Sequence, residues 1–292
     1  MTRLKGIFPA LITPFTRNGR VNEQALRQIV RMNIKKGVNG FYVGGSTAEA
    51  FLLSLEERRL ILDVVLDETK RSVPIIAHVG CISTDQTVEL ARHAREAGVD
   101  AISAITPFYY DFTASEVLQH YQRLMDSVDL PVIVYYFPAL SGVNLSASEL
   151  RDLLSRERVV GIKHTSYNLF QLERLKRAKS GLLVYNGHDE IFLAGLAMGA
   201  DGAIGSTYNF MAEKFLAIRR YFNDHRYEEA RRLQGEANEI IELLIRVGVI
   251  PGTKVVLKMM GIDCGVCREP FRQLTPEEEN LLRQAVQKYL AV

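Results

Sequence analysis

The chain has 292 residues, of which 47% are hydrophobic and 24% are charged, so it can bury the core of a sizeable soluble domain. Its 36 basic and 34 acidic residues are scattered and give a formal net charge of +2, which excludes the basic surface expected of a nucleic-acid-binding protein. The apolar stretch 6–12 is broken by Pro9 and lacks a signal-peptide cleavage site, and no run approaches the roughly 18 apolar residues of a membrane span. We therefore expect a cytoplasmic protein with no membrane or nucleic-acid partner.

Short runs rich in branched apolar residues alternate with amphipathic segments along most of the chain. The near-continuous apolar content of these runs is typical of parallel strands that are buried on both faces. The predicted strands are 8–11, 40–43, 75–78, 101–104, 132–135, 160–163, 183–185 and 202–205.

Helices with recognisable ends lie between these strands. The helix expected over 54–69 begins with a capping box, Ser54-Leu-Glu-Glu57, and the helices expected over 21–36 and 84–97 each end at a glycine. Successive strand–helix units with right-handed connections close into a (β/α)8 TIM barrel more readily than they form an open sheet. An open, doubly wound α/β sheet is the alternative.

The pattern after residue 226 is helical. It predicts a barrel over residues 1–226 and a C-terminal helical extension over 227–292 that packs on the barrel as one structural unit. Within the extension, helices are expected over 227–247, 252–260 and 275–290.

The three cysteines cannot form a disulfide framework, and their odd number fits a reducing compartment. Cys264 and Cys267 form a single CxxC, without the second pair or the histidines that a zinc site needs. We interpret them, with no metal assigned, as ordinary residues of a surface turn.

The sixth predicted strand ends with Lys163, and catalytic groups of such barrels lie at the carboxyl ends of the strands. A buried lysine is costly unless it is paired or neutral. If burial lowers its pKa from about 10.4 towards 7, the neutral amine can attack a carbonyl carbon and form an imine. A lysine in a structural ion pair, or one that reaches solvent, explains the position equally well.

The fifth predicted strand ends with two adjacent tyrosines, Tyr135 and Tyr136. Imine chemistry needs a proton carrier, and a phenol can serve as one. Because side chains alternate along a strand, only one of the two can face the lumen, and the pattern does not say which. A tyrosine of the core is the alternative interpretation.

Three further strand ends carry polar residues. Gly44-Gly-Ser-Thr-Ala-Glu49 offers hydroxyls and free amides that can hold a carboxylate, although it is equally an ordinary turn. Asp189 and Glu190 either complement a helix dipole or accept hydrogen bonds from a polyhydroxylated substrate. Ser206 and Thr207 add two hydroxyls after the eighth strand.

Together these residues resemble the pyruvate-dependent class I aldolases, the superfamily of dihydrodipicolinate synthase and N-acetylneuraminate lyase. The similarity extends over nearly the whole chain in ordered blocks. These blocks are Ala10-Leu-Ile-Thr-Pro-Phe15, Tyr42-Val-Gly-Gly-Ser-Thr47, Ala77-His-Val-Gly-Cys81, Thr106-Pro-Phe-Tyr-Tyr110, Pro138-Ala-Leu-Ser-Gly142, Tyr185-Asn-Gly-His-Asp-Glu-Ile-Phe192 and Gly205-Ser-Thr-Tyr-Asn209.

The resemblance implies that Lys163 forms an imine with the keto carbon of N-acetylneuraminate, which is then cleaved to pyruvate and N-acetylmannosamine. It implies that Tyr135 shuttles the proton and that Ser46 and Thr47 hold the substrate carboxylate. The protonated imine is the electron sink, so we expect no metal and no other cofactor. The positions that the resemblance assigns to the sugar portion of the substrate are Thr165, Gly187, Asp189, Glu190 and Ser206.

The resemblance also bears on assembly and specificity. Tyr109 matches a tyrosine that reaches into a neighbouring subunit's site, and these enzymes are typically homotetramers. The synthases place an arginine shortly after the catalytic tyrosine to bind a dicarboxylate. The segment Pro138-Ala-Leu-Ser-Gly142 has none, which favours a neutral polyol. The synthase reaction, another sugar-derived 2-oxo acid, and a non-catalytic protein that binds a keto acid are the alternatives.

Three positions depart from the usual lyase pattern. Ala48 replaces a glycine and strains the carboxylate loop if that position needs positive φ. Tyr136 stands where asparagine is usual, and Tyr167 stands where a small residue is common. If Tyr167 faces the pocket, we expect it to narrow the sugar site.

Overall fold

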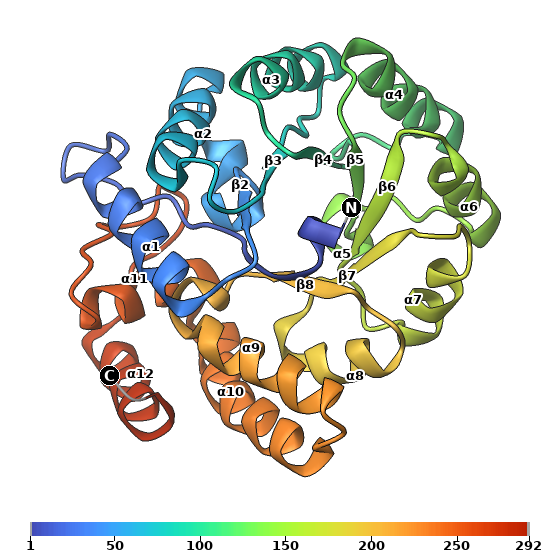
Figure 1. Ribbon diagram of the computed structural model, residues 1–292. Coiled ribbons are helices and arrows are strands. Elements are labelled where there is room, and N and C mark those ends of the chain that lie inside the picture. Colours follow the sequence, from blue (N-terminus) through green and yellow to red (C-terminus); the bar gives the residue numbers. More distant parts are fainter. Residues whose placement is uncertain (1, 291–292) are drawn as a thin grey trace.

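The computed structural model describes residues 2–290 and contains a barrel of eight parallel strands inside a ring of helices (Figure 1). The strands pair in the order β1-β8-β7-β6-β5-β4-β3-β2. A parallel bridge between Ala10 and Tyr42 joins the two ends of this order, and the Leu11 N–H donates to the Tyr42 carbonyl at 2.9 Å. The sheet is therefore closed, which confirms the TIM barrel and excludes the open sheet.

The strands agree with the predicted ones to within two residues at each end. They are β1 (Gly6–Pro9), β2 (Phe41–Val43), β3 (Ile75–His78), β4 (Ala101–Ile105), β5 (Val132–Tyr136), β6 (Val159–His164), β7 (Leu183–Asn186) and β8 (Gly202–Gly205).

Helices follow the strands around the barrel and continue into the C-terminal extension. They are α1 (Glu23–Lys36), α2 (Leu55–Thr69), α3 (Thr84–Ala97), α4 (Ala114–Ser127), α5 (Pro138–Ser141), α6 (Ala147–Ser155), α7 (Leu169–Lys176), α8 (Phe192–Ala197), α9 (Tyr208–Asn223), α10 (Tyr227–Val247), α11 (Val249–Met259) and α12 (Pro276–Tyr289). Short 3-10 helices are η1 (Thr2–Leu4), η2 (Ser46–Ala48), η3 (Ala50–Leu52) and η4 (Asp189–Ile191).

Local capping explains where most helices begin. The capping box at Ser54 is formed as predicted. Helix α1 begins two residues later than expected, because the Asn22 side chain accepts from the Ala25 N–H and caps it there. Helix α11 begins three residues earlier than expected, because Pro251 falls in its first turn, where a helix tolerates proline.

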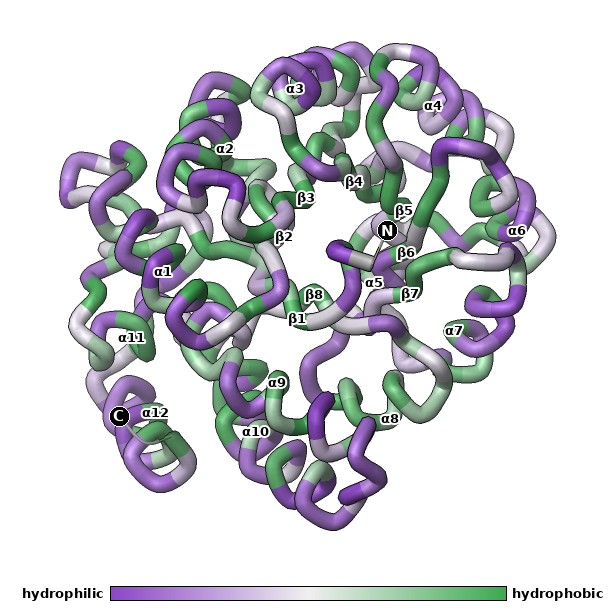
Figure 2. Tube along the Cα trace, in the orientation of Figure 1, coloured by the Kyte–Doolittle hydropathy of each residue, from purple (hydrophilic) through white to green (hydrophobic). Residues whose placement is uncertain are grey.

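Two layers of apolar side chains explain why the strands are apolar on both faces. The lumen holds one cluster, which includes Phe8, Tyr42 and Tyr135. A larger cluster lies between strands and helices, and the helices expose their hydrophilic sides (Figure 2). Leu4 belongs to the lumen cluster, and its carbonyl accepts from the Tyr185 hydroxyl at 2.5 Å, so the N-terminal segment closes the amino end of the lumen.

Helices α10 and α11 pack against α9, and α12 packs against α10 and α11. Their apolar side chains, such as Leu244 and Leu282, join the outer core cluster of the barrel. The boundary between residues 226 and 227 stays a prediction. The interpretation of the CxxC as part of a surface turn is wrong for Cys264, whose exposed fraction is only 1%. The segment after α11 packs under Phe15, whose N–H donates to the Cys264 carbonyl at 2.9 Å.

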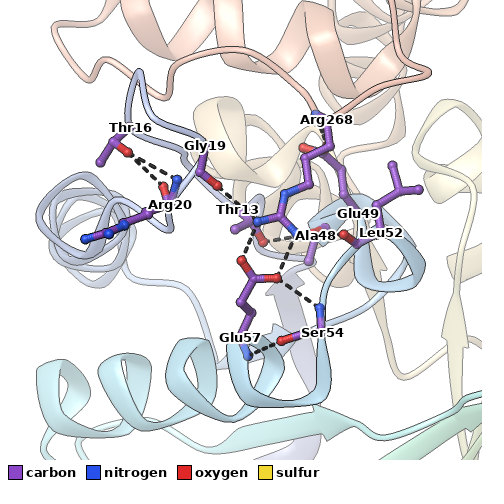
Figure 3. A network of polar contacts seen from close by, with 10 residues as sticks. All are labelled: Thr13, Thr16, Gly19, Arg20, Ala48, Glu49, Leu52, Ser54, Glu57 and Arg268. Atoms are coloured by element: carbon purple, nitrogen blue, oxygen red, sulfur yellow. Dashed lines mark hydrogen bonds and ion pairs between the residues drawn. The ribbon is translucent and has the colours of Figure 1, made fainter.

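A polar network ties the extension to the loop after β2 (Figure 3). The Arg268 N–H donates to Glu49 Oε2 at 2.7 Å, and its guanidinium donates to the Leu52 carbonyl at 2.7 Å and forms an ion pair with Glu57. Lys254 Nζ lies 2.7 Å from Glu49 Oε1, and the two side chains are 2% and 0% exposed. Glu49 is therefore a buried charge that the extension neutralises.

Backbone strain in this loop lies at Glu49 and not at Ala48. Glu49 has a φ of 59°, whereas Ala48 lies within η2 and has no positive φ. Strain at Ala48 is expected only if that position needs a positive φ, and this condition is not met. The ion pair and the hydrogen bond on the Glu49 carboxylate hold the strained residue in place.

Replacement of Lys254 tests this anchor. Lys254→Met leaves the Glu49 carboxylate buried without its cation, so we expect the free energy of unfolding to fall by about 3 to 5 kcal/mol. Urea denaturation measures this change. Lys258→Met, on the exposed side of the same helix, is the matched control and should change the stability by less than about 0.5 kcal/mol. Equal stability of the two variants would contradict the role of Lys254 as the buried partner of Glu49.

Candidate active site

A cavity of about 350 Å³ opens at the carboxyl ends of the strands. Every residue predicted for the site except Tyr109 lines this cavity. The lining residues among them are Ser46, Thr47, Tyr135, Lys163, Thr165, Gly187, Asp189, Glu190 and Ser206. Barrel closure thus brings together side chains from five loops or strand ends that are distant in sequence.

Lys163 lies on β6 with its side chain in the lumen, and only 4% of the residue is exposed. Its Nζ lies 4.1 Å from the centre of the Tyr135 ring and 4.6 Å from that of Tyr42. Burial lowers the pKa of Lys163 to about 7, although the charge of Asp189 opposes this shift. Among residues 2–290 no carboxylate lies within ion-pair distance of the amine, so Lys163 is not part of a structural ion pair. Its burial also excludes a lysine whose amine reaches solvent.

Tyr135 is the tyrosine that faces the lumen. It pairs in register with Lys163 on the neighbouring strand, whereas Tyr136 belongs to the outer core cluster and stacks on His164. Burial raises the pKa of Tyr135 to about 12, and the hydroxyls of Ser46 and Thr165 oppose the shift. The phenol is therefore protonated at neutral pH and can donate a proton next to the amine.

The loop after β2 carries the hydroxyls of Ser46 and Thr47 within η2. Thr47 Oγ1 lies 2.7 Å from Ser206 Oγ, so this loop and the loop after β8 meet at the cavity. Hydroxyls with neighbouring free amides suit a carboxylate, because they neutralise it by hydrogen bonds without a cation.

His78 positions this loop and was not singled out by the sequence. The Ile105 N–H donates to His78 Nε2 at 3.2 Å, so Nδ1 carries the proton and donates to the Gly44 carbonyl at 2.9 Å. Burial and the charge of Arg58 hold the pKa of His78 well below its usual value, so the ring stays neutral. The only sequence signal was its place in the Ala77-His-Val-Gly-Cys81 block.

The two carboxylates after β7 have different environments. Asp189 is buried, and its Oδ2 accepts from the N–H and the hydroxyl of Thr207 at 2.9 Å and 2.7 Å. Burial raises the pKa of Asp189. The hydrogen bonds of the Asp189 carboxylate come from the loop after β8 and not from the amides of its own helix. Asp189 therefore does not serve mainly to complement a helix dipole. Glu190 lies nearer the opening, with 19% of its side chain exposed.

An apolar wall closes the side of the cavity that faces the C-terminal extension, and sequence reasoning missed it. Phe137 and Leu140 add apolar surface from the region after β5. Because helices α10 and α11 look amphipathic whatever they pack on, their pattern does not reveal that they face a cavity. Helices α10 and α11 line the cavity with Ile241, Leu244, Ile245, Val249 and Ile250.

Tyr109 lies outside the cavity of its own chain. It is 82% exposed, has a φ of 81°, and contacts Tyr110 edge-on in a separate surface hollow. Its predicted role in a neighbouring subunit's site stays a prediction.

Known proteins resemble this chain over nearly its full length. The N-acetylneuraminate lyase of Rhizobium meliloti (strain 1021) is 49% identical over 290 residues, which are 99% of this chain and 96% of the relative. The solved structure of CdNal from Clostridium difficile in complex with mannosamine has a TM-score of 0.95 at 36% identity and covers 98% of this chain and 99% of that one. That of N-acetylneuraminate lyase from Fusobacterium nucleatum has a TM-score of 0.93 at 37% identity and covers 99% of each chain. Residues 3–289 match the dihydrodipicolinate synthetase family, and the chain therefore belongs to that family.

Proposed function

We propose that this protein is a class I aldolase that cleaves N-acetylneuraminate to pyruvate and N-acetylmannosamine. The observation that carries the proposal is the buried Lys163 amine, with a pKa of about 7, against the Tyr135 phenol in the cavity. The relatives named N-acetylneuraminate lyase support this substrate.

The chemistry follows from the protonation states of the two groups. The neutral Lys163 amine attacks the keto carbon, and the Tyr135 phenol gives its proton to the departing hydroxide, which leaves as water and forms the protonated imine. The Tyr135 phenolate then takes the proton of the C4 hydroxyl. As the C3–C4 bond breaks, its electron pair moves into the imine to give an enamine, and C4 leaves as the aldehyde. Protonation of the enamine at C3 and hydrolysis release pyruvate and the free amine.

The remaining lining residues bind the substrate in this proposal. Ser46 and Thr47 hold the carboxylate next to the keto carbon, and the position of η2 at the cavity supports this role. Thr165, Gly187, Asp189, Glu190 and Ser206 contact the sugar portion. This set is polar but carries no cation beyond Lys163, which supports a neutral polyol over a second carboxylate.

The alternatives are less well supported. The synthase reaction on aspartate semialdehyde needs a cation for its second carboxylate, and α5 has no arginine. Another sugar-derived 2-oxo acid would use the same machinery. A non-catalytic protein that binds a keto acid has no need for a lysine with a pKa lowered to about 7.

We further propose a cytoplasmic homotetramer in which Tyr109 reaches a neighbouring subunit's site. The exposure of Tyr109 and Tyr110, 82% and 62%, supports an interface at this loop. Of the helices in residues 2–290, none combines the length and the apolar composition that crossing a bilayer requires.

Turnover of N-acetylneuraminate tests the substrate. We expect release of pyruvate, measured by coupled reduction to lactate, and complete loss of this activity in Lys163→Ala, because the imine cannot form. Borohydride reduction with pyruvate should add one pyruvate-derived mass at Lys163, located by peptide mapping. Trapping that persists in Lys163→Ala would refute the mechanism, and turnover of a different 2-oxo acid alone would refute the substrate.

The pKa of Lys163 predicts a pH dependence of imine formation. The amine is protonated below its pKa and reactive above it, so the rate of trapping with pyruvate and cyanoborohydride should rise from about pH 5.5, pass its midpoint near pH 7 and then level off. Asp189→Asn removes the charge that raises this pKa, so the midpoint should move to lower pH. A midpoint near the ordinary lysine value of about 10.4 would contradict the assignment.

Tyr135→Phe tests the proton shuttle. Loss of the phenol should lower kcat for N-acetylneuraminate by about 10² to 10⁴-fold, because proton transfer then depends on water. Tyr136→Phe is the matched control, since that side chain packs in the outer cluster, and its kcat should stay within about threefold of wild type. Similar losses in both variants would indicate a general packing effect instead.

A further inference from the structure

The loops after β6 and β7 meet at the mouth of the cavity through Tyr167. Its ring stacks on that of His188, with centroids 4.3 Å apart and planes at 8°. Its hydroxyl donates to Glu190 Oε1 at 2.5 Å, and His188 Nδ1 lies 3.3 Å from the same oxygen. Tyr167 is 63% exposed and lines the cavity, so it lies at the rim.

Neighbouring strands fix this arrangement. His164 at the end of β6 pairs with Asn186 at the end of β7, and the loops that follow remain in contact. A Cβ at Gly187 would lie 2.0 Å from Thr165 Oγ1, so glycine is needed for this approach. The close packing of the two loops brings Tyr167 onto His188 and within reach of Glu190.

The Glu190 carboxylate is ionised, but one of its two oxygens is already occupied by side-chain donors. Burial raises its pKa, but the hydrogen bonds from His188 and Tyr167 outweigh burial and hold the pKa below its usual value. Both side-chain donors use Oε1, and no side chain of residues 2–290 donates to Oε2. A carboxylate with two free oxygens can accept from two neighbouring hydroxyls, whereas this one presents a single free oxygen.

We propose that Tyr167 is a specificity-determining residue that restricts Glu190 to one hydroxyl of the substrate. This proposal rests on the proposed function. Lys163 lies deep in the lumen and Glu190 at the rim, so the hydroxyls that reach Glu190 are those farthest from the keto carbon. The occupied Oε1 makes the site weakly selective between sugar chains that differ by one terminal hydroxymethyl group.

Aldol synthesis with pyruvate and two acceptor sugars tests this specificity. D-Mannose and D-lyxose share their configuration, but D-lyxose lacks the terminal hydroxymethyl group. The measured quantity is the ratio of kcat/KM for the hexose to kcat/KM for the pentose. In Tyr167→Phe the stacked ring is kept and Oε1 keeps only the His188 contact, so it can accept from a second substrate hydroxyl and we expect this ratio to rise about tenfold. KM for pyruvate should not change, because pyruvate binds at the lysine.

Two comparisons complete the design. Phe170→Leu is the matched control, because Phe170 is an aromatic residue of α7 with 74% exposure and does not line the cavity, and it should keep the wild-type ratio. Tyr167→Gly removes the stacked ring as well and should also raise the ratio.

The outcomes separate this proposal from the proposed function. A raised ratio in both Tyr167 variants, with the Lys163 pyruvate adduct still formed on reduction, supports the role of Tyr167. An unchanged or lowered ratio in Tyr167→Phe, with the adduct formed, overturns the role of Tyr167 and leaves the aldolase proposal intact. Absence of the adduct in the wild-type protein overturns the proposed function and this inference with it.

Discussion

Desolvation of the Lys163 amine links the barrel fold to the chemistry of the site. The amine lies among the rings of Tyr42 and Tyr135 in the lumen, where an ammonium ion would lose its hydration without gaining an ion pair. Burial therefore lowers its pKa to about 7. Because closure of the sheet and the apolar lumen cluster create this environment, the barrel itself supplies the chemical property that a nucleophilic amine needs.

The two carboxylates after β7, Asp189 and Glu190, have different electrostatic roles in the cavity. Asp189 is buried near Lys163, and its charge favours the protonated amine, so the pKa of Lys163 stays near 7 and does not fall further. Glu190, one residue later, is held ionised at the rim by His188 and Tyr167. Two adjacent carboxylates thus differ in charge behaviour because one is enclosed by the lumen and the other receives hydrogen bonds near solvent.

The C-terminal extension is part of the site although it lies outside the barrel. Its helices provide the apolar wall, and Lys254 and Arg268 hold Glu49 directly after the Ser46–Thr47 loop. This connection restrains the Ser46 and Thr47 hydroxyls that line the cavity, while His78 restrains the other end of the same loop through Gly44. The loop is therefore fixed on both sides by buried partners, which suits a binding site that must be preorganised.

Features that depend on short stretches of chain could be predicted from the amino-acid pattern. Burial on both faces makes each strand apolar, and a local hydrogen bond sets a helix start such as Ser54, so the eight strand–helix units and the lysine at the end of β6 could be predicted. The match to a known family then singled out Tyr135 in advance. Alternation alone could not choose between Tyr135 and Tyr136.

The meeting of distant segments could not be predicted in this way and became visible in the folded chain. In the closed barrel Tyr135 faces the lumen. Packing of the C-terminal extension places α10 and α11 against the cavity and buries Cys264. The contact of Tyr167 with Glu190 depends on the close approach of two loops at Gly187, and no local signal encodes it. The physical reason is that propensity, capping and periodicity act within a few residues, whereas these contacts are set by strand register and by the packing of whole elements.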